Sequence, residues 1–253
     1  MDLGLSGKKA IITGSTRGIG RAIANLLADE GVDLGICARN QEEVDSAVAD
    51  LKAKGVNVTG AVVDVADKDS YQAWIASAAE ALGGIDIFVP NVSAGGGAMG
   101  DEGWQNNFNV DLLGTTRGIE AAMPYLEKSD AGSIVVISST AGVETFMGPQ
   151  PYNAIKAALV VHAKQLSQAL APSGIRVNCV SPGPVYIEGG AWEFIKANMT
   201  DLYEATLNDI PRGSFGTAEE VANAVAFLAS PAASLITGVN LVADGGFTKR
   251  VQL

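Results

Sequence analysis

The sequence is poor in residues that form disulfides or metal sites. Of 253 residues, two are cysteines and one is a histidine. Cys37 and Cys179 both lie in apolar runs, so we expect two buried structural thiols rather than a disulfide. Because His162 is the only histidine and no cysteine pair has ligand spacing, the sequence predicts no metal site.

Basic residues are also few, and long apolar runs are missing. Lys and Arg number 17 against 28 Asp and Glu, which gives a formal net charge of −11. This balance argues against a partner such as nucleic acid or an anionic membrane, since either requires a basic face. No segment approaches the roughly 18 apolar residues of a membrane-spanning helix, and the N-terminal residues lack the apolar stretch of a signal peptide. We therefore expect a cytoplasmic protein that acts on a small molecule.

Short apolar runs alternate with longer amphipathic stretches along nearly the whole chain. Strands are expected near 10–12, 32–38, 57–63, 85–89, 133–137, 175–180 and 239–242, and helices directly after the first strand and near 41–54, 68–82, 104–126, 150–171 and 217–229. Continuously apolar strands that alternate with helices predict an α/β fold with a parallel sheet covered on both faces. We expect one Rossmann-like, doubly wound domain over residues 1–253 with a seven-stranded sheet.

Two stretches depart from this rhythm. Residues 185–212 hold Gly189-Gly190 and two short helical pieces where a strand might be expected. Such an insertion is typical of a lid or substrate loop, which we favour over a structural excursion that caps the sheet. The helix near 150–171 lacks a clear polar face, so its second side requires cover from another element of the chain or from a second subunit.

A glycine-rich segment follows the first strand and opens the first helix. Glycine permits a tight turn and close approach of a diphosphate, and the amides of the helix N-terminus then face the phosphates. This context predicts a dinucleotide site rather than a structural turn. Its residues are Gly14, Ser15, Thr16, Arg17, Gly18, Ile19 and Gly20.

The end of the second strand bears on the choice of cofactor. An acid there would bind the free ribose hydroxyl of NAD, but the sequence has Ala38-Arg39. Arg39 can hold a 2′-phosphate, and Arg17 can add a second positive contact. Although both arginines are also explained as solvated surface charges, we predict NADP(H) in preference to NAD(H). Asp64-Val65 follow the third strand, where the adenine edge is expected to meet the sheet.

Candidate catalytic groups cluster in the second half of the chain. Tyr152 and Lys156 are four residues apart on one helix face, and an ammonium beside a phenol favours the ionised phenolate. Such a tyrosine can exchange a proton with a carbonyl or alcohol oxygen. Ser139 ends a strand and either donates to the substrate oxygen or caps the next turn. Asn109 lies in an otherwise apolar helix and is expected to be buried, either anchoring a water that links Lys156 to solvent or as a satisfied core amide.

Together these residues resemble the short-chain dehydrogenase/reductase family over essentially the whole chain. The matching pieces are Thr13–Gly20, Asp64-Val65, Asn91, Asn109, Ser139, Tyr152–Lys156, Pro182-Gly183, Ile236–Gly238 and Asp244–Gly246. The resemblance implies a catalytic tetrad of Asn109, Ser139, Tyr152 and Lys156, with Lys156 also holding the nicotinamide ribose. It further implies cofactor contacts from Asn91, Pro182, Gly183 and Val185, and a homotetramer (or a homodimer) formed through helices 104–126 and 150–171.

Three departures from the family pattern surround the expected substrate site. Pro90-Asn91-Val92-Ser93 replaces the usual Asn-Asn-Ala-Gly, and Ile187 replaces a threonine that usually touches the carboxamide. The glycine runs 95–97 and 189–190 give flexible walls on both sides of this site. Candidate substrate-pocket residues are Ser93, Val143, Tyr186 and Trp192, with Phe194 and Met199 expected above an apolar substrate.

These features predict an NADP(H)-dependent oxidoreductase that interconverts a carbonyl and a secondary alcohol on a small, fairly apolar substrate. A 3-oxoacyl-[acyl-carrier-protein] reductase is the alternative within the family. Where basic docking residues are expected for that activity, the chain has Glu127–Asp130 and Pro172-Ser173, which disfavour an acidic carrier. An alternative of another class is a non-catalytic NADP(H)-binding scaffold or redox sensor.

Overall fold

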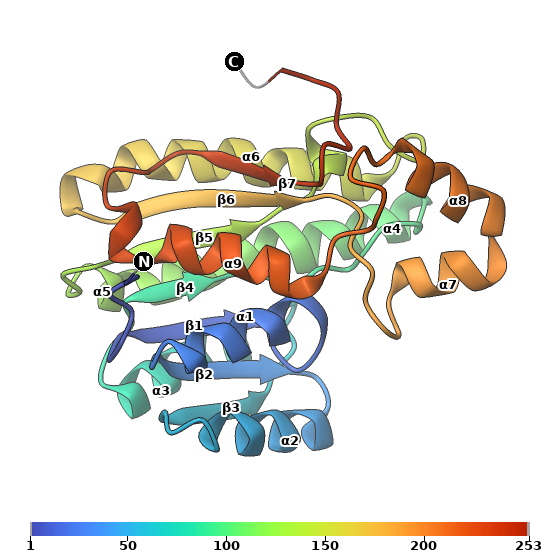
Figure 1. Cartoon of the computed structure of the whole chain (residues 1–253). Helices are drawn as coiled ribbons and strands as arrows, with labels where there is room; N and C mark the ends of the chain where they lie inside the picture. The colour runs from blue at the N-terminus through green and yellow to red at the C-terminus, as the bar shows by residue number, and fades with distance from the viewer. Residues whose placement is uncertain (1, 252–253) are drawn as a thin grey trace.

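The computed structural model describes residues 2–251 and contains one parallel sheet with helices on both faces (Figure 1). The elements run in the order β1 (Lys9–Thr13), α1 (Gly18–Asp29), β2 (Asp33–Ala38), α2 (Gln41–Lys52), β3 (Val58–Val62), α3 (Lys68–Leu82), β4 (Ile87–Val89), α4 (Gly100–Asn107), η1 (Phe108–Leu113), α5 (Gly114–Leu126), β5 (Ser133–Ile137), η2 (Thr140–Gly142), α6 (Pro151–Leu170), η3 (Ala171–Ser173), β6 (Arg176–Pro182), α7 (Ala191–Asn198), α8 (Thr200–Asp209), α9 (Ala218–Ala229), η4 (Pro231–Ala233) and β7 (Asn240–Ala243).

The strand order in the seven-stranded sheet is β3-β2-β1-β4-β5-β6-β7. Each neighbouring pair is parallel, so all carboxyl ends meet at one edge, at the right in Figure 1. The order reverses between β1 and β4, and ligands of doubly wound sheets bind in the crevice outside such a switch point. The predicted Rossmann-like fold is confirmed.

The core consists of two apolar layers, one on each face of the sheet. The first packs α1, α2 and α9 against the strands, with Ile23, Leu51 and Val225 among its buried residues. The second packs α3, α5 and α6 against the other face and includes Tyr71 and Ile119. Strands buried from both sides must be apolar at successive positions, which explains the continuous apolar runs of the sequence.

The helix ends follow local chemistry. Asp67 caps α3 by accepting from the backbone N–H of Ser70, and the helix ends at Gly83, which has a φ of +76°. Thr217 and Glu220 form a reciprocal capping box at the start of α9. These residues satisfy backbone groups that would otherwise lack partners at the helix termini.

The helix predicted over 104–126 differs from the observed segment. The chain is helical from Gly100 onward, but a π-helical segment, η1, separates α4 from α5. A wider turn rotates the following side chains out of the ordinary 3.6-residue register, and such segments are frequent at functional sites. Within this segment Asp111 is buried, whereas Asn109 is exposed. The predicted burial of Asn109 is therefore wrong.

The segment 185–212 contains two helices, α7 and α8, as predicted. Both helices extend beyond the carboxyl edge of the sheet (Figure 1). Its start is tied to the chain by a bridge between Val185 and Gly216. Aromatic side chains join it to the body of the protein. Trp192 and Tyr203 lie 4.8 and 4.7 Å, respectively, from the ring of Phe215, measured between centroids.

Helix α6 packs one face on the sheet and leaves the other open within the described chain. Ile155, Leu159 and Ala163 are buried, whereas Val161 is 59% exposed. His162 is half-buried, and this burial lowers its pKa. No other element of residues 2–251 therefore covers Val161.

Both cysteine thiols are buried and free, as predicted. Burial raises the pKa of Cys37 and that of Cys179 to about 12, so neither thiol is ionised near neutral pH. Within residues 2–251 no cluster of three or more potential metal ligands is present. None of the helices in that range has both the length and the apolar character needed to cross a membrane.

Candidate active site

The glycine-rich turn after β1 depends on the absence of side chains. Gly14 and Gly18 have φ values of +66° and +56°, a region that favours glycine. A Cβ on Gly20 would overlap the carbonyl oxygen of Gly14 and lie 2.5 Å from Nδ2 of Asn91. The Ser15 hydroxyl donates to the carbonyl oxygen of Ile12 and holds the turn from below. The turn is therefore a cradle that a side chain would fill.

The loop after β4 is tied to this turn. Asn91 Nδ2 donates to the carbonyl oxygens of Thr13 and Gly14, at 3.0 and 3.1 Å. The Thr13 hydroxyl accepts from the backbone N–H groups of Asn91 and Val92. Val92 lies against Gly14, with its Cγ2 2.8 Å from the position of a Cβ there. Asn91 thus fixes the two loops at the switch point, and the substituted Val92 adds to that packing.

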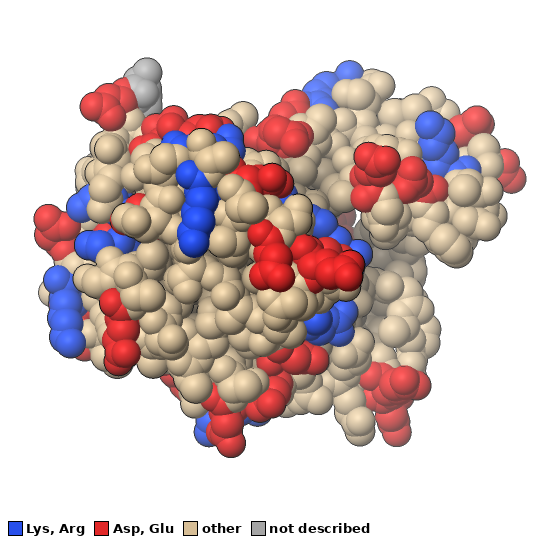
Figure 2. All heavy atoms as spheres, turned by 90° about the horizontal axis from the view of Figure 1, so that it is seen from below, with Lys and Arg blue, Asp and Glu red and all other residues tan. Residues whose placement is uncertain are grey.

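A cleft of about 610 Å³ opens beside the turn and is visible as a hollow at the right of Figure 2. Its volume lies within the roughly 300–1,000 Å³ of small-molecule sites. The predicted cofactor residues that line it are Gly14, Thr16, Arg17, Gly18, Ala38, Arg39, Asp64, Val65 and Asn91, together with the predicted substrate residue Ser93. The cradle, the basic edge and the volume fit a dinucleotide.

Other predicted cofactor residues lie outside the cleft lining. Ser15 and Gly20 are buried within the turn, and Ile19 is partly buried in the first turn of α1. Pro182, Gly183 and Val185 leave β6 toward α7, where the Gly183 N–H donates to Ala243. Ile187, which lines the cleft, packs against Gly18, with its Cδ1 3.3 Å from the position of a Cβ there. An apolar side chain therefore stands where the family has a threonine.

The basic edge of the cleft contains a carboxylate that sequence reasoning missed. Glu43 lines the cleft together with Arg17 and Arg39, and its Oε2 accepts from the Thr16 hydroxyl at 2.8 Å. Asn40 caps α2 by accepting from the Glu43 N–H, which fixes the position of the glutamate. The signal in the sequence was an Asn helix cap followed three residues later by a glutamate.

The predicted catalytic residues Ser139, Tyr152 and Lys156 form the chemical end of the site, and none of them lines the cleft. Lys156 lies at its buried centre. Its Nζ is 3.0 Å from Asp111 Oδ1 and 3.2 Å from the carbonyl oxygen of Ile137, and the exposed fractions of the Lys156 and Asp111 side chains are 2% and 0%. Burial is the largest single influence and lowers the pKa of Lys156, but the nearby Asp111 carboxylate and smaller contributions from Tyr152 and Cys179 together raise that pKa. Lys156 Nζ is 5.5 Å from the ring centroid of Tyr152.

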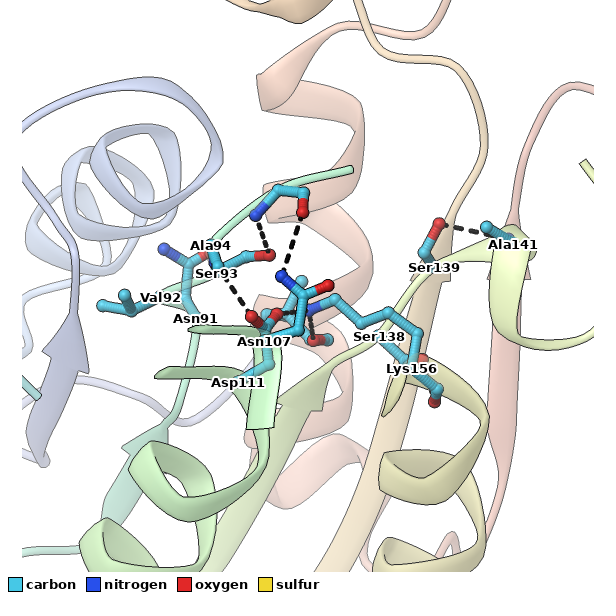
Figure 3. A network of polar contacts seen from close by, with 12 residues as sticks. Asn91, Val92, Ser93, Ala94, Asn107, Asp111, Ser138, Ser139, Ala141 and Lys156 are labelled. Carbon is cyan, nitrogen blue, oxygen red and sulfur yellow. Dashed lines mark hydrogen bonds and ion pairs between the residues drawn. The ribbon is translucent and has the colours of Figure 1, made fainter. Parts of the chain in front are cut away.

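Asp111, rather than the predicted Asn109, therefore meets Lys156. Its second oxygen, Oδ2, accepts from the backbone N–H of Ala94 at 2.8 Å. Asn107, also buried, donates from Nδ2 to the carbonyl oxygen of Gly95. Figure 3 shows both side chains reaching from the helix toward the loop after β4. The missed signal was a carboxylate in an apolar run, Val110-Asp111-Leu112-Leu113, which requires a buried partner.

Two serines at the end of β5 have different partners. The Ser138 hydroxyl donates to the carbonyl oxygen of Lys156 at 2.8 Å and joins β5 to α6. Ser139 Oγ accepts from the Ala141 N–H at 3.1 Å and caps η2, as the alternative interpretation predicts (Figure 3). This contact uses the hydroxyl as an acceptor and leaves its O–H free to donate to a substrate.

Tyr152 lies in the first turn of α6, beside the glycine loop after β4. A Cβ on Gly96 would be 3.7 Å from the Tyr152 ring. The adjacent Gln150 accepts from the Gly97 N–H at 2.7 Å. Asn153 holds the preceding loop by donating to the carbonyl oxygens of Phe146 and Gly148. These bonds hold the tyrosine between the loops after β4 and β5.

The predicted substrate residues are placed unevenly. Val143, Tyr186 and Trp192 are partly buried, and Trp192 packs against Phe146 with a ring separation of 6.2 Å. Lys196 Nζ lies 5.7 Å from the Tyr186 ring centroid. Phe194 and Met199 are 64% and 46% exposed, and of the four predicted pocket residues only Ser93 lines the cleft. Phe146, which packs on Trp192, was not singled out from the sequence.

The chain is similar to known proteins over nearly its whole length. The family profile described as enoyl-(acyl carrier protein) reductase matches residues 14–248. Isoepoxydon dehydrogenase patN of Penicillium expansum is 40% identical over 247 residues, covering 96% of this chain and 95% of that protein.

Two solved structures show the same fold. L-Sorbose reductase from Gluconobacter frateurii, complexed with NADPH and L-sorbose, has 32% identity and a TM-score of 0.90, covering 99% of this chain and all of that one. An NAD⁺-bound xylitol dehydrogenase has 25% identity and a TM-score of 0.87, with 94% and 98% covered. The chain belongs to the short-chain dehydrogenase/reductase family and is an oxidoreductase that uses a nicotinamide cofactor.

Proposed function

We propose that the protein interconverts a small ketone and a secondary alcohol with NADP(H), using Ser139, Tyr152 and Lys156. The observation that carries this proposal is the buried Lys156 ammonium, 5.5 Å from the Tyr152 ring, at the carboxyl edge of the sheet. The bound nicotinamide supplies or accepts the hydride. The Tyr152 phenol gives its proton to the carbonyl oxygen or takes one from the alcohol. The Ser139 O–H donates to the same oxygen, and the Lys156 charge stabilises the phenolate.

The preference for NADP(H) is supported by the basic edge of the cleft. Arg17 and Arg39 both line it, and guanidinium groups bind phosphate through charge-assisted hydrogen bonds. Glu43 opposes this preference, because its carboxylate lines the same cleft. Two positive charges against one negative charge favour the phosphorylated ribose. The NADPH complex of the sorbose reductase is consistent with this choice, and the NAD⁺-bound xylitol dehydrogenase makes it worth testing.

We further propose that residues 185–212 form a lid. Residues 187–191 line the cleft, and Gly189, with a φ of +67°, supplies a hinge at the start of α7. Trp192 and Phe146 give the substrate side an aromatic surface, which suits a small, fairly apolar molecule. In this proposal the chain is a single Rossmann-like domain that contains both the cofactor site and the lid.

A homotetramer or homodimer is also part of the proposal. Val161 on α6 and Phe108 on η1 are 59% and 43% exposed, and exposed apolar side chains on neighbouring helices suit a subunit contact. Light scattering on the purified protein measures the mass directly. The cytoplasmic location expected from the sequence stays a prediction.

The acyl-carrier alternative requires a basic docking face. Figure 2 shows Lys and Arg side chains scattered among Asp and Glu on the face it presents. In the expected docking region, Lys8 is paired with Asp130. An acidic carrier therefore meets mixed rather than positive charge.

The test is a panel of free ketones, secondary alcohols and one acyl-carrier thioester, followed at the nicotinamide absorbance with NADPH and with NADH. We expect turnover of free substrates with NADPH, and a loss of about 10²–10⁴-fold in Tyr152→Phe with cofactor binding retained. If only the acyl-carrier thioester is turned over, the proposed substrate class is wrong and the acyl-carrier alternative replaces it. Cofactor binding without any turnover would favour the scaffold, and a preference for NADH would overturn the assignment to Arg17 and Arg39.

A further inference from the structure

We propose that Asp111 is the positioning residue of the active site, a buried counter-ion that holds the Lys156 ammonium in place and connects it to the loop after β4. This inference rests on the proposed function for its catalytic consequence. It concerns a residue that the family resemblance does not assign, because the resemblance places an asparagine in this role and Asn109 is exposed.

One ion pair and one hydrogen bond at residue 111 favour a carboxylate there. Its two oxygens face two donors, the Lys156 ammonium at 3.0 Å and the Ala94 N–H at 2.8 Å. A carboxylate accepts at both ends, whereas an amide presents one acceptor and one donor. An asparagine at this position would therefore turn its NH₂ group toward one of the two donors. Because the side chain is 0% exposed, solvent cannot accept a hydrogen bond from the NH₂ group in place of the facing donor.

Asp111 is the group near Lys156 that balances the charge of the buried ammonium. Within the described residues, the titratable groups that act on Lys156 are Asp111 from η1, Tyr152 from α6 and Cys179 from β6. Burial keeps the Cys179 thiol neutral. From β5, Ile137 contributes only a carbonyl oxygen. Asp111 is thus the carboxylate that offsets the burial of the ammonium, and without it burial favours the neutral amine.

The contact with Ala94 extends the effect toward the cofactor cleft. Ala94 and Ser93 line that cleft, and the next residue, Gly95, is held by Asn107. The Asp111 carboxylate therefore fixes the position of the Lys156 ammonium and also that of Ala94 in one wall of the cleft. Asp111 lies in the π-helical segment η1 and points inward toward Lys156 (Figure 3), whereas Asn109 in the same segment is exposed.

The experiment compares Asp111→Asn and Asp111→Glu with Asp101→Asn, which removes the same charge from the exposed first turn of α4. For alcohol oxidation, we expect the alkaline limb of the kcat/KM profile to move down by about one pH unit or more in Asp111→Asn. The limb stays near its original place in Asp111→Glu, which keeps the charge but loses rate through altered position. An unchanged limb in Asp111→Asn would overturn the proposal.

A second measurement does not depend on turnover. Melting temperatures of Asp111→Asn, Lys156→Met and the double variant form a double-mutant cycle. We expect the double variant to melt at a higher temperature than the sum of the two single losses predicts, because each single variant leaves one partner unpaired. Additive losses in melting temperature would contradict the proposed ion pair, even if the enzyme is active. Non-additive losses in a protein that turns over no substrate would instead reject the proposed function and leave the counter-ion in place.

Discussion

The two ends of the site, the cofactor cleft at the glycine-rich turn and the buried chemical end around Lys156, which does not line that cleft, are built by different means. At the glycine-rich turn the backbone forms the site, and the decisive property of Gly14, Gly18 and Gly20 is that they lack side chains. At the chemical end, side chains from η1 and α6 meet in a buried ion pair between Asp111 and Lys156. A steric site should lose its function at every pH when it is filled, whereas an electrostatic site should respond to pH and to charge. Variants can separate these two behaviours.

The largest effect is expected at the steric end. Gly20→Ala places a methyl group against the carbonyl oxygen of Gly14 and Asn91 Nδ2, so the backbone of the turn and the Asn91 contact to it must both shift. We expect a loss of about 3–5 kcal/mol in the free energy of unfolding and loss of NADPH binding at every pH tested.

The matched control is Gly55→Ala, at a glycine with a φ of +88° and open space around it. This change carries the backbone cost of a positive φ but no collision, so we expect a loss of only about 1 kcal/mol. Denaturant unfolding and fluorescence titration with NADPH measure both variants. Equal losses would mean that the collision at Gly20 is relieved by backbone movement.

A smaller and pH-dependent effect is expected at the electrostatic end. Burial lowers the pKa of Lys156 in the folded state, but the Asp111 carboxylate, with smaller contributions from Tyr152 and Cys179, raises it overall. Such a group contributes stability that is fully present below the ordinary lysine pKa of about 10.5 and is lost as the pH rises through the folded value. We therefore expect Asp111→Asn to lose about 2–4 kcal/mol near neutral pH, and less above about pH 10.5. Denaturant unfolding across this range measures the trend, and a loss that grows with pH would contradict it.

The contrast between the two ends also explains what the sequence could reveal. The strands, the glycine turn and the break at 185–212 follow from local patterns, since apolar runs and glycine spacing act over neighbouring residues. The partner of Lys156 does not, because it depends on where a π-helical turn points a side chain 45 residues away in the chain. Sequence reasoning chose Asn109 in a regular helix, and the irregular turn selects Asp111. Likewise, the apolar character of Phe194 and Met199 did not reveal that both are exposed.

The charge of the cofactor cleft can also be changed at its basic edge, which Arg17 and Arg39 form. Arg39→Asp replaces a phosphate-binding guanidinium with an acid that would bind a free ribose hydroxyl. We expect NADPH affinity to fall about 10- to 100-fold while NADH affinity rises, because a charge-assisted contact is lost and a repulsive one gained. Arg21→Ala removes an arginine of α1 that pairs with Asp50 of α2, and neither residue lines the cleft, so this control should leave both affinities unchanged. Equal losses for the two cofactors would show that Arg39 does not read the phosphate.

The smallest effect tests whether Glu43 weakens the same preference. Its carboxylate is exposed, lines the cleft beside Arg17 and Arg39, and is held by the Thr16 hydroxyl. Glu43→Gln keeps an oxygen that accepts from Thr16 but removes the negative charge, so NADPH should bind about two- to fivefold more tightly and NADH should be unaffected. Because solvent screens exposed charges, the gain should shrink as salt is added. Glu42→Gln removes an equal charge one residue earlier, outside the cleft lining, so any gain common to both variants would reflect net charge rather than the position of Glu43.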